Sequence, residues 1–287
     1  MIARRAIQAL FLGTCLLFPL NSHAIVLDWN AVNWTSTWGS PAAASVSQAF
    51  TVEGVTVTIT VARGGSTGTG EVSNPTGTPD DVNTPVSTGG QEGLMVDVDF
   101  NNMTTAFDYT PVGGDDYLTF TIAFSTTVAY VNFDLWDIDL GNDGTPSHYQ
   151  DVVIFDSAGA NPTLSLTAGN TDSEIFTDND GNSATRGIAT LGSTTNTGNE
   201  DDTSGTANVN VNYGSTGVTS VSFRYYSGNG TRNGTDVNLG TTDPTLQRIS
   251  LGDITFVPEP STWVSGGLLA LLLIGHGLHR KRVRAAS

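Results

Sequence analysis

Hydrophobic and polar residues alternate along most of the chain between residues 25 and 256. A period of two residues is typical of a β-strand that buries one face, because successive side chains point to opposite sides of the backbone. The alternating or apolar segments are Phe50 to Val61, Leu94 to Phe100, Leu118 to Phe124, Ala129 to Leu135, Val152 to Phe155, Leu164 to Leu166, Val209 to Tyr213, Val221 to Tyr225 and Ile249 to Phe256. Each segment predicts a short strand.

No stretch before Thr262 repeats apolar residues at the spacing of 3.6 that marks an amphipathic helix. Gly, Asn, Asp and Thr separate the predicted strands, and Gly54 is expected to form a bulge or kink. We therefore predict an all-β domain over residues 25–256, an antiparallel β-sandwich of the jelly-roll kind. Residues 64–93 and 192–205 lack apolar spacing and are predicted to be long surface loops.

The N-terminal segment, residues 1–24, has the three parts of a secretory signal peptide. Arg4 and Arg5 provide the positive charge, and an apolar run follows them. Small residues before position 25 predict cleavage between Ala24 and Ile25, with the Sec translocon and signal peptidase as partners. Because Cys15 lies inside the signal, the mature chain has no cysteine, which excludes disulfides and thiolate metal sites.

The C-terminal segment, residues 257–287, predicts one transmembrane helix from Trp263 to Leu278. Four basic residues follow the apolar run, and they place the C-terminus in the cytoplasm by the positive-inside rule. Those residues are Arg280, Lys281, Arg282 and Arg284, and a hinge of Val257, Pro258, Glu259 and Pro260 precedes the helix.

This order of Pro-Glu-Pro motif, short apolar span and basic end resembles the PEP-CTERM sorting signal of exopolysaccharide-producing Gram-negative bacteria. The resemblance covers only residues 257–287. It implies that an exosortase cuts near the motif and delivers the domain to the cell surface. The protein is then expected to be held briefly at the inner membrane, with the domain in the periplasm, before it becomes a surface or extracellular protein.

The predicted domain is strongly acidic. All of the chain's 28 acidic residues except Glu259 lie in residues 25–256, which hold no lysine. The basic residues there are Arg63, Arg186, Arg224, Arg232 and Arg248. This balance excludes nucleic acid as a partner, because phosphates need cationic side chains. It is compatible with a divalent cation, whose ligands are carboxylate oxygens.

An acidic segment follows one predicted strand and precedes the next. Asp137, Asp139, Asp143 and Asp151 occur in this segment, where the apolar pattern stops. Carboxylates gathered at strand ends repel one another unless a cation binds them, so we predict a structural Ca²⁺ site. The alternative is an acidic hairpin in solvent, in which the same residues only form the turn.

Aromatic residues suggest a second kind of site. Trp136 and Tyr149 flank the acidic segment, and Trp136 lies on the strand face opposite the core residues. Exposed aromatic rings beside Asp and Asn can hold sugars, so Trp136 and Tyr149 are candidate ligand contacts. The N-terminal tryptophans Trp29, Trp34 and Trp38 are expected to pack into the base of the domain instead.

Catalysis has little support in the sequence. The paired carboxylates Asp115-Asp116 and Asp201-Asp202 point to opposite faces of any strand, and His148 is the only histidine between residues 25 and 256. We therefore expect a protein that is not an enzyme, with a structural or adhesive role in the extracellular matrix, stabilised by calcium. The alternatives are a calcium-dependent exopolysaccharide-binding module and, third, a carboxylate-based glycan-active enzyme.

A second resemblance supports the predicted fold. The strand from Phe133 to Asp139, and Arg248 to Phe256 before the anchor, are similar to a recurrent domain of anchored bacterial surface proteins, including PEP-CTERM proteins. The resemblance implies a β-sandwich and no particular activity.

Overall fold

The computed structural model describes residues 23–32, 34–36, 45–64, 93–98, 100, 117–142, 148–155, 161–170, 173–177, 181–187, 207–214, 217–228, 231–232, 235–236 and 247–259. Within these residues the regular elements are β-strands, with no α-helix. The strands with assigned register pair in antiparallel fashion. The all-β, antiparallel prediction is therefore confirmed.

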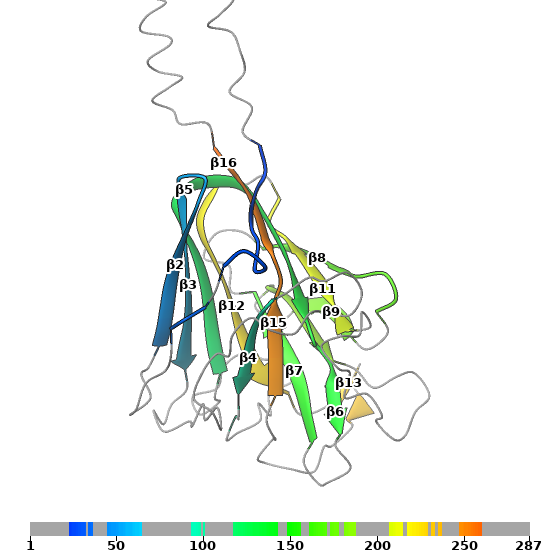
Figure 1. The fold of residues 1–287 in the computed structure, drawn as a ribbon. Coiled ribbons are helices and arrows are strands. Elements are labelled where there is room, and N and C mark those ends of the chain that lie inside the picture. Colours follow the sequence, from blue (N-terminus) through cyan, green and yellow to red (C-terminus); the bar gives the residue numbers. More distant parts are fainter. Residues whose placement is uncertain are drawn as a thin grey trace, which may run out of the picture. The chain divides into compact units, whose positions relative to one another are not determined.

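The strands are β1 (Ile25–Leu27), β2 (Ser45–Val52), β3 (Val55–Gly64), β4 (Leu94–Val98), β5 (Tyr117–Trp136), β6 (Leu140–Asn142), β7 (His148–Ile154), β8 (Thr163–Leu166), β9 (Ser173–Thr177), β10 (Ser183–Gly187), β11 (Val209–Asn212), β12 (Val218–Ser227), β13 (Thr231–Arg232), β14 (Thr235–Asp236), β15 (Gln247–Leu251) and β16 (Ile254–Pro258). Figure 1 shows them as arrows.

The chain divides into two compact units. One unit runs from Ala24 to Val257, and it contains the buried core of the described residues. The other consists of Met1–His23 and Pro258–Ser287, of which the structure describes only His23, Pro258 and Glu259.

Strand β5 is 20 residues long and changes its partners along its length. Its first part, from Tyr117 to Phe124, pairs with β3 and β12. Its last part, from Asn132 to Trp136, pairs with β11 and β15. Two sets of strands therefore share β5, namely β2-β3-β5-β12-β7-β10-β9 and β4-β15-β5-β11-β8, and β16 also pairs with β5 and carries β1 on its other side. Figure 1 shows β5 passing from one set to the other.

An aromatic cluster forms the centre of the core. The ring of Phe223 in β12 stacks on Phe120 in the first part of β5, with centroids 4.7 Å apart. The same ring lies 6.0 Å from Phe133, in the last part of β5, and 5.6 Å from Phe155. Because Phe120 and Phe133 both contact Phe223, the inner faces of the two strand sets pack on each other. Burying a Phe side chain contributes about 1.5–3 kcal/mol to folding.

The hairpin between β2 and β3 corrects the expectation at Gly54. Val52 pairs directly with Val55, so only Glu53 and Gly54 form the connection. Their φ angles are 49° and 83°, and two positive values are characteristic of a type I′ turn. Gly54 therefore occupies a tight turn and not a bulge, since glycine accepts a positive φ without strain.

The two ends of the domain pair with each other. Ile25, Val26 and Leu27 in β1 lie opposite Phe256, Thr255 and Ile254 in β16. Trp29 adds two contacts next to this pair of strands: its backbone N–H donates to Asp253 Oδ1 at 2.9 Å, and its indole Nε1–H donates to Gly252 O at 3.0 Å. Residues more than 220 positions apart are thereby joined.

Two predicted strand assignments need correction, and one hairpin was not predicted. Leu118–Phe124 and Ala129–Leu135 are parts of the single strand β5, because its backbone stays extended through the exposed residues Ser125 and Thr126. The segment from Arg248 to Phe256 is two strands, β15 and β16, separated by Gly252 and Asp253. The hairpin of β9 and β10 was not predicted, because its residues show little alternation of apolar and polar side chains.

Candidate functional site

The acidic segment converges on one buried carboxyl group. Asp151, in the middle of β7, is only 1% exposed. Its Oδ1 accepts hydrogen bonds from the Tyr225 hydroxyl at 2.5 Å and from Gln247 Nε2 at 3.0 Å. Its Oδ2 accepts from the backbone N–H of Asp139 at 3.2 Å, and its own N–H donates to Asp139 O at 2.9 Å.

These contacts join several strands through one side chain. Tyr225 belongs to β12, Gln247 begins β15, and Asp139 lies between β5 and β6. β12 and β7 belong to one strand set and β15 to the other. Asp151 is therefore a hydrogen-bonded link between the two sets, which we call the carboxyl link.

Two further carboxylates of the predicted calcium site, Asp137 and Asp139, lie in the segment that follows β5. Asp137 is 8% exposed and Asp139 is completely buried. Asp137 has a φ of 67°, in the left-handed region, where Asp is one of the few side chains that is tolerated. The backbone therefore turns at Asp137, directly after β5 ends.

Burial raises the pKa of Asp151 well above its ordinary value of 3.8, and the nearby charge of Asp137 raises it further. The hydrogen bonds from Tyr225 and Asp139 act in the opposite direction. Burial has the larger effect because a carboxylate loses its hydration when it leaves water. The geometry thus favours the protonated form of Asp151 over a wider pH range than for an exposed aspartate.

The predicted calcium site is partly outside the described residues. Asp143 is not described, so the predicted set of four carboxylates is not tested. Among the described residues, no group of three or more His, Cys, Asp and Glu side chains is arranged to hold a metal ion. Calcium binding by Asp137, Asp139, Asp143 and Asp151 stays a prediction.

The predicted exposure of Trp136 is wrong. Its side chain is 5% exposed, and its ring packs over two glycines. A Cβ placed on Gly93 would lie 2.4 Å from the ring, and one on Gly252 would lie 2.9 Å from it. The absence of side chains at these glycines lets the backbone cover the ring, so Trp136 is a packing residue and offers no exposed face to a sugar. The side chain of Tyr149 is outside the described part.

The expected burial of the N-terminal tryptophans is confirmed for the two that the structure describes. Trp29 is fully buried and Trp34 is 2% exposed. Phe50 lies 5.6 Å from the Trp29 ring and 6.3 Å from the Trp34 ring, centroid to centroid. Trp38 lies outside the described residues.

Sequence reasoning missed a second acidic group beside β16. Burial raises the pKa of Asp253, the charges of Asp28 and Asp134 raise it further, and the hydrogen bond from Trp29 lowers it. This group could not be predicted from the sequence, because Asp28, Asp134 and Asp253 are far apart in the chain.

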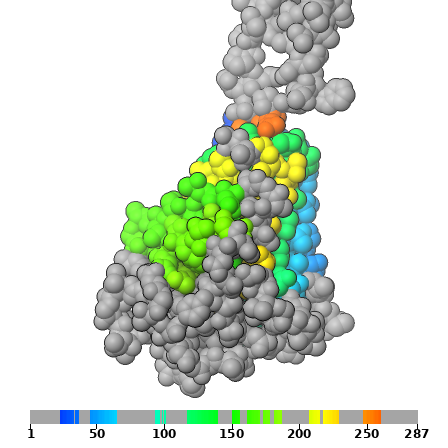
Figure 2. All heavy atoms as spheres, turned by 180° about the vertical axis from the view of Figure 1, so that it is seen from behind, coloured from blue at the N-terminus to red at the C-terminus, as the bar shows by residue number. Residues whose placement is uncertain are grey.

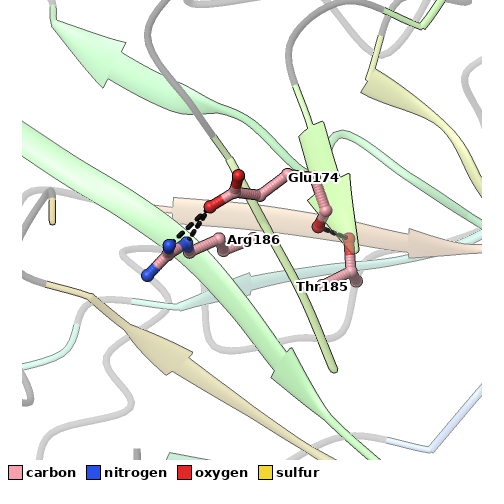
Figure 3. A network of polar contacts seen from close by, with 3 residues as sticks. All are labelled: Glu174, Thr185 and Arg186. Carbon is pink, nitrogen blue, oxygen red and sulfur yellow. Dashed lines mark hydrogen bonds and ion pairs between the residues drawn. The ribbon is translucent and has the colours of Figure 1, made fainter. Parts of the chain in front are cut away.

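The cationic side chain of Arg186 lies near the edge of the strand set that ends in β10 and β9. Arg186 in β10 faces Glu174 in β9, and its Nε lies 2.5 Å from Glu174 Oε1 (Figure 3). The guanidinium also lies 4.9 Å from the centre of the Phe176 ring, and Thr185 Oγ1 donates to Glu174 O at 2.9 Å. Glu174 therefore neutralises Arg186, and the pair holds β9 to the sheet.

The structure describes some of the residues around the two predicted cleavage sites. Ala24 is exposed and Ile25 is the buried first residue of β1. Val257 and Pro258 end β16 half-buried, and Glu259 is exposed. The rest of the sorting segment is outside the described part, namely Pro260, Trp263 to Leu278, Arg280, Lys281, Arg282 and Arg284. Within the described part of the chain, no helix has the length and apolar character to cross a membrane.

Neither the family models nor the curated proteins include a match to this chain. Among solved structures, the K2 cleaved adhesin domain of Lys-gingipain (Kgp) is similar to this chain at 14% sequence identity, over 79% of this chain and 99% of that chain. The TM-score is 0.23, and at this value the likeness supports no statement about function.

The carboxyl link predicts a stability that depends on pH. The folded chain holds the Asp151 proton more tightly than the unfolded chain, so the contribution of this group is fully present below its ordinary pKa of 3.8. It is lost as the pH rises through the raised pKa of the folded state. Urea unfolding in EDTA should show that the wild type and Asp151→Asn converge in stability at low pH and that the wild type falls relative to the variant as the pH rises. If the stabilities of the wild type and Asp151→Asn differ by the same amount at every pH, the raised pKa of Asp151 is contradicted.

Proposed function

We propose that this chain is an exported protein that an exosortase processes and delivers to the cell surface or extracellular matrix. Its role there is structural or adhesive and not enzymatic. The working part is the acidic β-domain, a two-layer sandwich of jelly-roll kind, with a signal peptide before it and one membrane helix after it. Its partners on the way are the Sec translocon, signal peptidase and the exosortase.

The observation that carries this proposal is where the compact unit begins and ends. The unit starts at Ala24, the last residue of the predicted signal peptide. It ends at Val257, the first residue of the predicted sorting motif. A chain that loses both terminal segments would therefore keep its complete described core.

The paired terminal strands give further support. β1 begins at Ile25, directly after the predicted cut, so signal-peptide removal would leave this strand whole. β16 extends to Pro258 and pairs with β1, and Glu259 beyond it is exposed. A cut on the C-terminal side of Pro258 would leave the hydrogen-bonded strand intact and would act on accessible chain.

The alternative role in binding exopolysaccharide loses one of its two aromatic candidates. Trp136 is covered by backbone, so it cannot stack on a sugar ring in this fold. The carboxylate-based enzyme is not tested at the paired carboxylates considered for it, because Asp115-Asp116 and Asp201-Asp202 lie outside the described residues. Of the described carboxyl groups, Asp151 already accepts hydrogen bonds from protein groups on both oxygens. The structural or adhesive role is therefore the proposal that we retain.

The processing proposal predicts both ends of the mature protein. Mass spectrometry of the exported protein, isolated from a host that has an exosortase, should find Ile25 as the first residue and a C-terminus beyond Pro258 but before Trp263. A host without the exosortase is the control, and there the C-terminus should remain Ser287. Exported protein that retains Ser287 in both hosts would refute exosortase processing.

The calcium prediction has a separate test. A bound cation would offset the repulsion among the buried carboxylates, so Ca²⁺ should raise the Tm of the purified chain and EDTA should lower it again. Asp139→Asn should reduce the shift, and Glu53→Gln, which changes an exposed carboxylate in the β2–β3 turn, should not. A Tm that is the same in Ca²⁺ and in EDTA would end the calcium proposal.

A further inference from the structure

Two buried polar side chains meet the carboxyl link from different strand sets. Ser227 in β12 is completely buried, and Gln247, the first residue of β15, is 1% exposed. Among the described residues, neither Ser227 Oγ nor Gln247 Oε1 has a hydrogen-bond partner. A buried polar oxygen without a partner is costly, and in a folded protein it indicates the position of a bound ion or water.

Both side chains are directed towards Asp151. Ser227 lies directly opposite Asp151 in the pairing of β12 with β7, and directly opposed residues have their side chains on the same face of a sheet. Gln247 comes from the other strand set, and its Nε2 donates to Asp151 Oδ1 at 3.0 Å. Figure 2 shows the green part of the chain, which includes β7 to β10, packed beside the yellow part, which includes β11 and β12. Ser227 Oγ and Gln247 Oε1 therefore belong to the buried cluster around Asp151.

The cluster is acidic. Asp139 is completely buried, and its backbone N–H donates to Asp151 Oδ2 at 3.2 Å. Among the described residues, the charge that acts on Asp151 is that of Asp137, which has the same sign. A buried carboxylate is costly unless a cation or enough hydrogen bonds compensate its charge. A positive ion is therefore the bound group that suits this cluster, since water brings no charge.

The neutral oxygens supply what the carboxylates lack. Ca²⁺ binds about six to eight oxygens, from carboxylates, amide carbonyls and water. Among the described residues, no three His, Cys, Asp or Glu side chains are arranged around one ion, so carboxylates alone do not complete such a shell there. Gln247 Oε1 is an amide carbonyl oxygen, and Ser227 Oγ has two lone pairs, so both can face a cation.

We propose that Gln247 Oε1 and Ser227 Oγ are ligands of the calcium site, together with Asp139 and Asp151 of the predicted set. This assignment rests on the calcium part of the proposed function, and it adds two ligands from outside the acidic segment of the sequence. The bound ion joins β7 and β12 of one strand set to β15 of the other. Calcium thus holds the two sets together at the carboxyl link, where the hydrogen bonds of Asp151 already connect them.

Calorimetric titration of the full chain with Ca²⁺ tests both ligands. The chain is purified in EDTA and then transferred to buffer without a chelator. Gln247→Leu removes one ligand oxygen and should raise the Kd for Ca²⁺ by about tenfold or more, a loss that altered metal sites commonly show. Ser227→Ala removes a smaller group and should raise the Kd several-fold.

Two further variants distinguish a ligand from a packing residue. Gln150 is the matched control, because it is also 1% exposed and directly precedes Asp151, but its side chain lies on the opposite face of β7. Gln150→Leu should leave the Kd unchanged. Gln247→Glu keeps an oxygen at the same position and should bind Ca²⁺ at least as tightly as the wild type, although the added charge beside Asp151 should lower its Tm in EDTA.

The wild type and the variants decide different points. No binding of Ca²⁺ by the wild type would overturn the calcium proposal and these ligands together. Wild-type binding with an unchanged Kd in Gln247→Leu and in Ser227→Ala would overturn the ligands alone, as would equal weakening by Gln247→Leu and Gln150→Leu or loss of binding in Gln247→Glu. Melting curves in EDTA check that each variant is folded, and Ser227→Ala decides the assignment if Gln247→Leu is not.

Discussion

The domain depends on strand β5, because one continuous backbone belongs to both strand sets. A 20-residue strand cannot remain in one flat sheet as it twists. Strand β5 pairs with β3 up to Phe124 and with β12 up to Val128, and it pairs with β11 from Asn132 onward. The two sets are therefore fixed relative to each other by covalent structure as well as by packing. Phe223 is positioned to contact Phe120 and Phe133 only because both parts of β5 face the same core.

Two groups of hydrogen bonds stabilise the packing of the strands around β5. The carboxyl link at Asp151 connects β12 and β15 in the interior, where an unsatisfied carboxylate would be costly. Trp29 connects the start of the domain to Gly252 and Asp253, next to the pairing of β1 with β16. Together with the pairing of β1 and β16, these contacts join the first and last strands of the domain.

The sequence predicted the class of the fold because a period of two is a strong signal of strands with one buried face. It did not predict that β5 is one strand, since exposed Ser125 and Thr126 resemble a turn. The burial of Trp136 was also missed, because coverage by the distant residues Gly93 and Gly252 depends on tertiary structure. For the same reason Asp151 was found as an acidic residue, but its partners Tyr225 and Gln247, 74 and 96 positions away, were not.

Hydrogen exchange along β5 in the native full chain tests the central claim, that one strand unites both strand sets. If it does, the slow-exchanging amides from Leu118 to Phe124 and from Val131 to Leu135 should share one free energy of opening, because neither part can open without the other. They should respond equally to low concentrations of denaturant. Two separate opening energies, with one part of β5 exchanging while the other stays protected, would contradict the account.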